Sequence, residues 1–144
     1  NNVAQLITEY ARNQPEAKDD PALSNSKIAP IINKAGRQRM LAQRIGLYYA
    51  AYQLGILGGE VKVELEKSLD AFDSAYTELF TAECNTNRIL EEWTFVISDW
   101  RKIKNQRDAV LDKSFDPETM FTLTNNLLKN MDTITGMYAD LMDQ

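Results

Sequence analysis

The 144-residue chain contains no histidine, which removes the commonest general base and the commonest metal ligand in proteins. Its single cysteine, Cys84, has no second thiolate for a disulfide within the chain, a zinc site or covalent haem attachment. Cys84 is then either a small buried or semi-exposed thiol or, alternatively, a disulfide link across a dimer. Glu-x-x-His pairs, which di-iron helical bundles require, are absent as well. We therefore expect a protein that is not an enzyme and that has no metal site and no cofactor.

Proline and glycine are scarce, with four and six residues, and long stretches without either favour helices over an all-β fold. No apolar run approaches the roughly 20 residues needed to span a bilayer. Lys and Arg total 16 against 21 Asp and Glu, and the net charge of −5 argues against nucleic acid as a partner. The chain starts Asn-Asn, so we read it as a processed mature protein or an excised domain, joined to a membrane only through segments outside it.

The spacing of apolar residues predicts an all-α fold. Residues 1–11 have the pattern of a short amphipathic helix, and residues 12–25, with two prolines, read as a polar linker. Longer helices are expected at about 26–57, 60–82, 87–113 and from Pro117 onward. We therefore predict an antiparallel up-down four-helix bundle over residues 26–144, with a short extra N-terminal helix and linker over residues 1–25.

Three local signals set the expected helix ends. Pro30 would be tolerable because it lies in the first turn of the first long helix. Gly58-Gly59 would end that helix. Asp116-Pro117 would open the last helix with a cap and a proline at the first helical position. The apolar seam expected on this last helix is Met120, Thr124, Leu127, Met131, Ile134, Tyr138 and Leu141.

One segment of the first long helix is rich in arginine. On a helix with about 100° per residue, Arg39 falls in a stripe of small and apolar residues. The other members of this stripe are Ile28, Ile32, Ala35, Ala42, Gly46 and Tyr49. A charge inside a close-packed seam is costly unless it is paired. Arg39 therefore either pairs with a carboxylate of a neighbouring helix or snorkels to water, or it meets its symmetry mate across a dimer axis with a bound anion between them.

A second line, about 180° away on the same helix, contains Asn33, Arg37, Met40 and Arg44. One interpretation is a solvated face. The other follows from Met40 together with Leu41, Leu47 and Tyr48, which make the helix apolar on much of its circumference. Such a helix is expected to contact both its own bundle and something else.

Residues 33–44 read Asn-Lys-Ala-Gly-Arg-Gln-Arg-Met-Leu-Ala-Gln-Arg. This segment resembles, almost residue for residue, the signature of the N-terminal sensory domain of type IV pili methyl-accepting chemotaxis transducers, the PilJ-type domain. Four amphipathic helices from about 28 to 143 are similar to the rest of that domain in pattern alone. The resemblance implies a ligand-binding sensory module for signal transduction, on the periplasmic or extracellular side of the bacterial inner membrane.

More distantly, the same segment is similar to the periplasmic nitrate/nitrite sensor kinases, in which an arginine followed by methionine binds the anion where two first helices meet in a dimer. Gly36 matches the glycine of that motif and Arg39-Met40 match its Arg-Met pair. The resemblance implies a homodimer through the first long helix, with a small-molecule or anion site at Arg39, Gly36 and Met40 and with Arg37, Asn33 and Arg44 nearby. Nitrate itself does not carry over, because Arg37 stands where the nitrate sensors have a small or neutral residue.

The sequence thus leaves two functions open. The first is a sensory domain of a chemotaxis-type or two-component receptor, in which a rod-like bundle passes small helix shifts along its length. The second is a stand-alone secreted periplasmic interaction or scaffold protein with the same fold, which the Asn-Asn start and the extra N-terminal helix suggest. Membrane spans encoded on both sides of the chain would favour the first function. An upstream signal peptide with a natural stop at Gln144 would favour the second.

Overall fold

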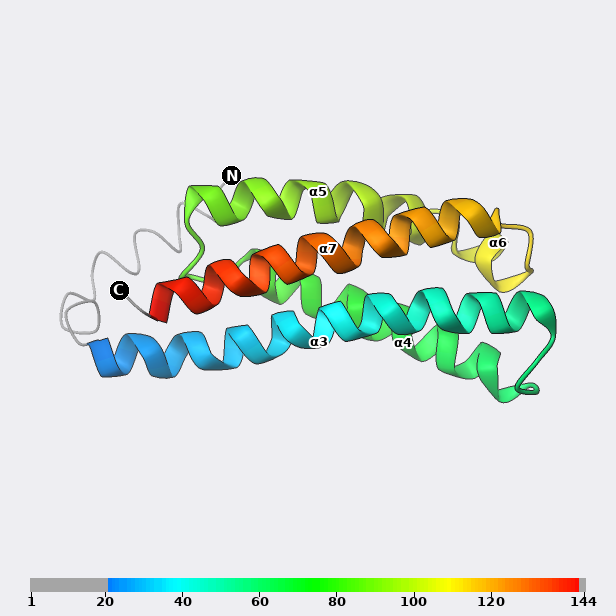
Figure 1. Cartoon of the computed structure of the whole chain (residues 1–144), viewed down its shortest axis with the longest axis horizontal. Helices are drawn as coiled ribbons and strands as arrows, with labels where there is room; N and C mark the ends of the chain where they lie inside the picture. Colours follow the sequence, from blue (N-terminus) through cyan, green and yellow to red (C-terminus); the bar gives the residue numbers. More distant parts are fainter. Residues whose placement is uncertain (1–20, 143–144) are drawn as a thin grey trace.

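The computed structural model describes residues 21–142, and over this range the chain consists of helices and short connections without a strand (Figure 1). The helices are α3 (Pro21–Leu54), α4 (Glu60–Phe80), α5 (Asn87–Lys104), α6 (Arg107–Leu111) and α7 (Pro117–Met142). The four long helices form a bundle, and α6 is a short helix between α5 and α7. The extra helix predicted over residues 1–11 lies outside the described residues.

Helix α3 packs against both α7 and α4, and α5 packs against α7. In Figure 1 the long helices follow the long axis of the molecule, and the start of α3 lies at the same end as the end of α7. Side-chain contacts agree with this picture. Lys34 in the first half of α3 pairs with Glu78 near the end of α4. Trp93 in the first half of α5 donates to the hydroxyl of Tyr138 near the end of α7.

The core is built from one face of each long helix. The seam predicted on α7 is confirmed, because its residues from Met120 to Tyr138 are buried and Leu141 packs at its edge. Helix α5 buries both of its tryptophans, and Trp100 packs against Phe72 of α4 with ring centroids 4.4 Å apart. The hydroxyl of Tyr138 receives the Trp93 Nε1 hydrogen at 3.0 Å and donates to Asn85 Oδ1 at 2.6 Å. Aromatic packing and satisfied polar groups therefore hold three helices together.

Helix α3 starts earlier than the sequence predicts. Pro21 occupies its first position, where the missing N–H of proline has no helical partner in any case. Residues 21–25, predicted as linker, are therefore helical. Pro30 lies inside the helix, so the prediction that it sits in the first turn was wrong. Pro30 is exposed there, and it costs α3 the one backbone hydrogen bond that its missing N–H would have donated.

Helix α3 also ends earlier than predicted, at Leu54 rather than at Gly58-Gly59. Gly55 has a φ of 69° and donates its N–H to Tyr52 O, while Ile56 donates to Ala51 O. This pair of hydrogen bonds is a Schellman motif, which requires the left-handed conformation that glycine adopts most easily. Gly55, not the later glycine pair, is therefore the stop signal.

The helix predicted over residues 87–113 is divided by Asn105 and Gln106 into α5 and α6. Ion pairs to α4 flank the break on both sides, Lys104 with Asp73 at 3.1 Å and Arg107 with Asp70 at 2.9 Å. At the end of α6 and just beyond it, three backbone carbonyls accept hydrogen bonds from side chains at the end of α3. Tyr49 Oη donates to Phe115 O at 2.5 Å, Tyr52 Oη to Leu111 O at 2.6 Å and Gln53 Nε2 to Lys113 O at 2.8 Å. The α6–α7 connection is thus fixed against the end of α3.

Candidate ligand site and interaction surface on helix α3

Arg39 lies on the side of α3 that faces α7. Its Nε is 3.2 Å from Asp132 Oδ1, and the side chains of the pair are 50% and 71% exposed. Of the two interpretations given by the sequence, this contact is the pairing with a carboxylate of a neighbouring helix. Exposed ion pairs of this kind contribute about 0–1 kcal/mol, so the contact can be exchanged for another at little cost.

The stripe of small residues around Arg39 brings α7 of the same chain close to α3. Ala35 and Ala42 are fully buried. A Cβ atom added to Gly46 would lie 2.8 Å from Thr124 Oγ1, closer than real Cβ contacts. Tyr49 continues the stripe and bonds to the backbone of Phe115. Gly46 therefore permits a helix approach that no other residue would allow without a shift of Thr124.

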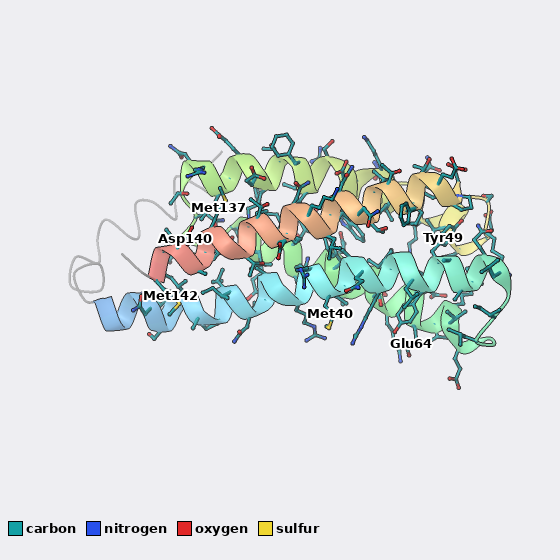
Figure 2. The ribbon with its side chains drawn as sticks, in the orientation of Figure 1. Met40, Tyr49, Glu64, Met137, Asp140 and Met142 are labelled. Atoms are coloured by element: carbon teal, nitrogen blue, oxygen red, sulfur yellow. The ribbon has the colours of Figure 1, made fainter. Side chains whose placement is uncertain are left out.

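The opposite side of α3 points away from the core. Its residues lie alternately three and four positions apart, and we name them the outer seam: Asn33, Gly36, Met40, Gln43, Leu47, Ala50 and Leu54. Six of the seven are exposed and Gly36 is half-buried. Leu47 is 64% and Leu54 75% exposed, and a Cβ atom on Gly36 would meet nothing within 4 Å. Figure 2 shows Met40 projecting from α3 on the side away from α7.

Arg37 and Arg44 border the outer seam on its α4 side, seven residues apart, and both are exposed. Among the ion pairs of the described residues, none includes either of them. Arg39 borders the seam on its α7 side. The structure therefore brings Asn33, Gly36 and Met40 onto one surface with arginines along both borders, and it places Arg39 in an ion pair beside that surface.

Sequence reasoning missed Gln38, which lies between two of the predicted site residues. Its side chain is fully buried, and Nε2 donates to Phe72 O of α4 at 2.9 Å. Its Oε1 is buried without a hydrogen-bond partner. The helical wheel contained the signal, because position 38 falls on the core side between Ala35 and Leu41.

A family model described as type IV pili methyl-accepting chemotaxis transducer N-term, PilJ, matches residues 23–119. The chain belongs to the PilJ family. The match begins inside α3, includes α4, α5 and α6, and ends in the first turn of α7, so all six predicted site residues lie within it. No curated protein and no solved structure matches the chain.

Membership of the PilJ family identifies the chain as a sensory domain of the chemotaxis-transducer type, a class of signal-transduction module rather than of enzyme. Along residues 21–142 of this PilJ domain, no helix combines the length and the apolar character needed to cross a membrane. The same part of the chain contains no group of three or more Cys, Asp or Glu side chains arranged to hold a metal ion. The likeness to nitrate/nitrite sensor kinases stays a prediction.

Proposed function

We propose that this PilJ domain is the extracytoplasmic, ligand-binding sensory domain of a bacterial chemotaxis-type or two-component receptor, and that it works as a homodimer through the outer seam of α3. The outer seam itself is the observation that carries the proposal. Single exposed hydrophobic residues are ordinary, but a heptad-like series of them over more than two heptads predicts a partner helix. On α3 the series includes Met40, Leu47 and Leu54, which are all exposed.

The partner that fits this seam best is a second copy of α3. A twofold dimer places the same surface of both chains in contact, so the surface must be complementary to itself. Gly36 and Ala50 leave room for a close approach of two helices, and Met40 and Leu47 supply apolar contact area. The polar seam residues Asn33 and Gln43 would fix the register, as buried polar residues do in coiled coils.

The arginines beside the seam support a small anion as the ligand. In a symmetric dimer, Arg37, Arg39 and Arg44 of both copies would border the contact between the two α3 helices. Like charges brought together repel each other unless an opposite charge lies between them. A bound anion would supply that charge, and it would compete with Asp132 for Arg39. The site we propose therefore consists of Arg39, Arg37 and Arg44 with Asn33, Gly36 and Met40.

We further infer that the long helices follow an antiparallel up-down order. Along α3, successive contacts meet positions of decreasing number on α7, from Asp132 beside Arg39 to Thr124 beside Gly46. The same holds for α4, where Glu78 pairs with Lys34 and Phe72 with Gln38. This order brings the start of α3 and the end of α7 to one end of the bundle, where a shift of one helix against the other can be passed on.

Sedimentation equilibrium of three proteins tests the dimer. We expect the wild-type domain to be dimeric and Leu47→Glu to be monomeric with an unchanged helical circular-dichroism spectrum, because a carboxylate in an apolar seam is costly to bury. Val63→Glu is the matched control, because Val63 is 50% exposed on the outer face of α4. It should stay dimeric. A wild-type monomer at high concentration, or a Leu47→Glu dimer, would contradict the proposal.

Thermal melting against a panel of small anions, nitrate and nitrite included, tests the ligand class. A ligand at about 100 times its Kd raises the free energy of unfolding by about 2.7 kcal/mol, which moves the midpoint by several degrees. The shift should disappear in Arg39→Ala and persist in Arg101→Ala, which removes an exposed arginine of α5. If no anion of the panel shifts the melting midpoint, the anion site is ruled out. The dimer is tested separately by sedimentation.

A further inference from the structure

A groove of about 470 Å³ lies between α5 and α7, on elements that the arginine-rich motif does not include. Its lining includes Glu92, Phe95 and Asp99 of α5 and Asn126, Asn130 and Thr133 of α7. The volume is in the range of pockets that hold small organic ligands. The side chains that line the groove converge on one space from two helices, whereas the outer seam lies on α3 alone.

The groove exists because each helix carries a line of mainly polar residues beside its buried face. On α5, Glu92, Phe95 and Asp99 are spaced by three and four residues and so lie on one side of the helix. On α7, Asn126, Asn130 and Thr133 have the same kind of spacing. The packing of α5 against α7 sets these two lines opposite each other.

The charge of the groove is negative. Glu92 and Asp99 supply two carboxylates, and among the described residues that line the groove none is a lysine or an arginine. The Asp99 side chain is only 15% exposed, and its ion-pair partner Lys102 is 62% exposed with Nζ 4.0 Å away. Burial raises the pKa of Asp99 above its ordinary value, against the opposing effects of Lys102 and a hydrogen bond from Asn126. Asp99 is therefore a carboxylate that a further cation would stabilise.

The remaining lining groups suit an alkylammonium ion. Phe95 is 57% exposed, so its ring can contact both a cation and an alkyl chain. The side-chain oxygens of Asn126 and Asn130 can accept hydrogen bonds from an N–H donor. On a helix, Glu92 and Asp99 lie about 10 Å apart along the axis, which suits a ligand with a charge at each end.

We propose that the α5–α7 groove binds an aliphatic di- or polyamine. Asp99 and Glu92 hold its ammonium groups, Phe95 contacts its carbon chain, and the two asparagines accept its remaining N–H groups. This site deepens the sensory function proposed above, since it assigns a second class of ligand to the same domain. It requires neither the dimer nor the anion site.

Isothermal titration calorimetry of the whole domain with 1,5-diaminopentane and with spermidine tests the groove. We expect saturable binding that weakens at least tenfold in Asp99→Asn and in Glu92→Gln. Glu91→Gln is the matched control, because Glu91 is exposed on α5 outside the groove, and it should bind like wild type. 1,5-Pentanediol, which has the same chain length without charge, should not bind.

Two further measurements separate this site from the proposed receptor dimer. Leu47→Glu should bind the amines as wild type does, so that loss of the dimer and loss of the groove are distinguishable. Amine affinity should fall as the pH falls, starting above the ordinary aspartate range, because the raised pKa lets Asp99 take up a proton there. Wild-type protein that binds neither amine, or Asp99→Asn that binds both unchanged, would overturn the proposal.

Discussion

The buried side chain of Gln38 in α3 has a hydrogen-bond partner for only one of its two polar atoms. Its amide nitrogen has a partner in Phe72 O, while its buried Oε1 has none. A buried acceptor without a partner costs about 1–3 kcal/mol, whereas a neutral hydrogen bond contributes about 1 kcal/mol. The two effects are of similar size and opposite sign. Gln38 therefore adds little to the stability of the fold, although it lies in the centre of the bundle.

This balance predicts that Gln38→Met leaves the free energy of unfolding unchanged or raises it by about 1 kcal/mol, because methionine of similar length removes both the hydrogen bond and the unpaired oxygen. Gln38→Glu keeps the shape and adds a buried charge, so it should destabilise the protein by several kcal/mol. Urea denaturation followed by circular dichroism measures both variants. A loss above about 2 kcal/mol in Gln38→Met would show that the bond to Phe72 outweighs the unpaired oxygen.

The sequence predicted the surroundings of the arginine motif better than its contacts. Helical periodicity placed Arg39 in a stripe of small residues, and the structure fills that stripe with α7 of the same chain. The pattern could not supply Asp132 as the partner, since that depends on the register of α3 against α7. Gln38 was missed because a glutamine between two arginines reads as part of a solvated surface.

At the scale of the helix, the approach of α3 to α7 depends on Gly46. Gly46→Ala would place its Cβ against Thr124, whose Oγ1 is held by a 2.8 Å bond to Met120 O. Threonine has few alternative rotamers, so the helices must move apart. We expect a loss of about 1–3 kcal/mol, as for other overpacked sites.

Urea denaturation of Gly46→Ala, of Gly136→Ala and of Gly46→Ala with Thr124→Ala checks this account of the helix contact. A Cβ on Gly136 would meet nothing within 4 Å, so that variant should gain about 0.5–1 kcal/mol from helix propensity. The double variant should recover part of the loss, because it removes the obstructing Oγ1. Equal stability of Gly46→Ala and wild type would mean that the two helices are less tightly packed than the structure shows.

Helix ends were predictable where a local signal acts alone. Asp116 caps α7 as expected, accepting the Thr119 N–H at 2.9 Å. The end of α3 was misjudged because three glycines follow within five residues, and sequence alone does not say which adopts the Schellman geometry. The break at Asn105-Gln106 contains neither glycine nor proline. On both sides of this break the chain contacts α4, and beyond it α6 contacts the end of α3. These contacts belong to the tertiary structure and cannot be read from the sequence.

At the scale of the whole molecule, one substitution at Gly36 should raise the stability of the single chain and prevent the assembly of two copies. A side chain at Gly36 meets open space within a single chain. In the dimer that we propose, it would lie in the contact between the two copies. Gly36→Lys should therefore raise the stability of the single chain by about 0.5–1 kcal/mol through helix propensity and abolish dimerisation. Urea denaturation in the Leu47→Glu background, which we expect to be monomeric, and sedimentation of the single Gly36→Lys variant measure the two effects. An unchanged dimer would place Gly36 outside the interface.

The α5–α7 groove is a feature of the whole molecule that the sequence did not predict. The all-helical fold and its core faces follow from periodicity and from the scarcity of glycine and proline. Glu92 and Asp99, however, belong to no motif in the sequence, and neither do Asn126 and Asn130. These residues meet only because of how α5 and α7 align lengthwise, and hydrophobic spacing sets which faces meet rather than how far one helix slides along another.

The hydrogen bonds from Tyr49, Tyr52 and Gln53 fix the Leu54 end of α3 to α6 and to the connection that follows it. Toward Pro21, the polar links of α3 include the buried hydrogen bond from Gln38 to Phe72 O and the ion pairs of Lys34 and Arg39, whose side chains are 42–71% exposed. The arm between Tyr52 and Pro21 is about 46 Å long at 1.5 Å per residue. A tilt of α3 by about 2° about its Leu54 end would move the start of the helix by about 1.6 Å, within the 1–2 Å range of helix shifts in switching proteins. A small rotation of α3 about its Leu54 end would therefore reach the Pro21 end as a displacement of that size.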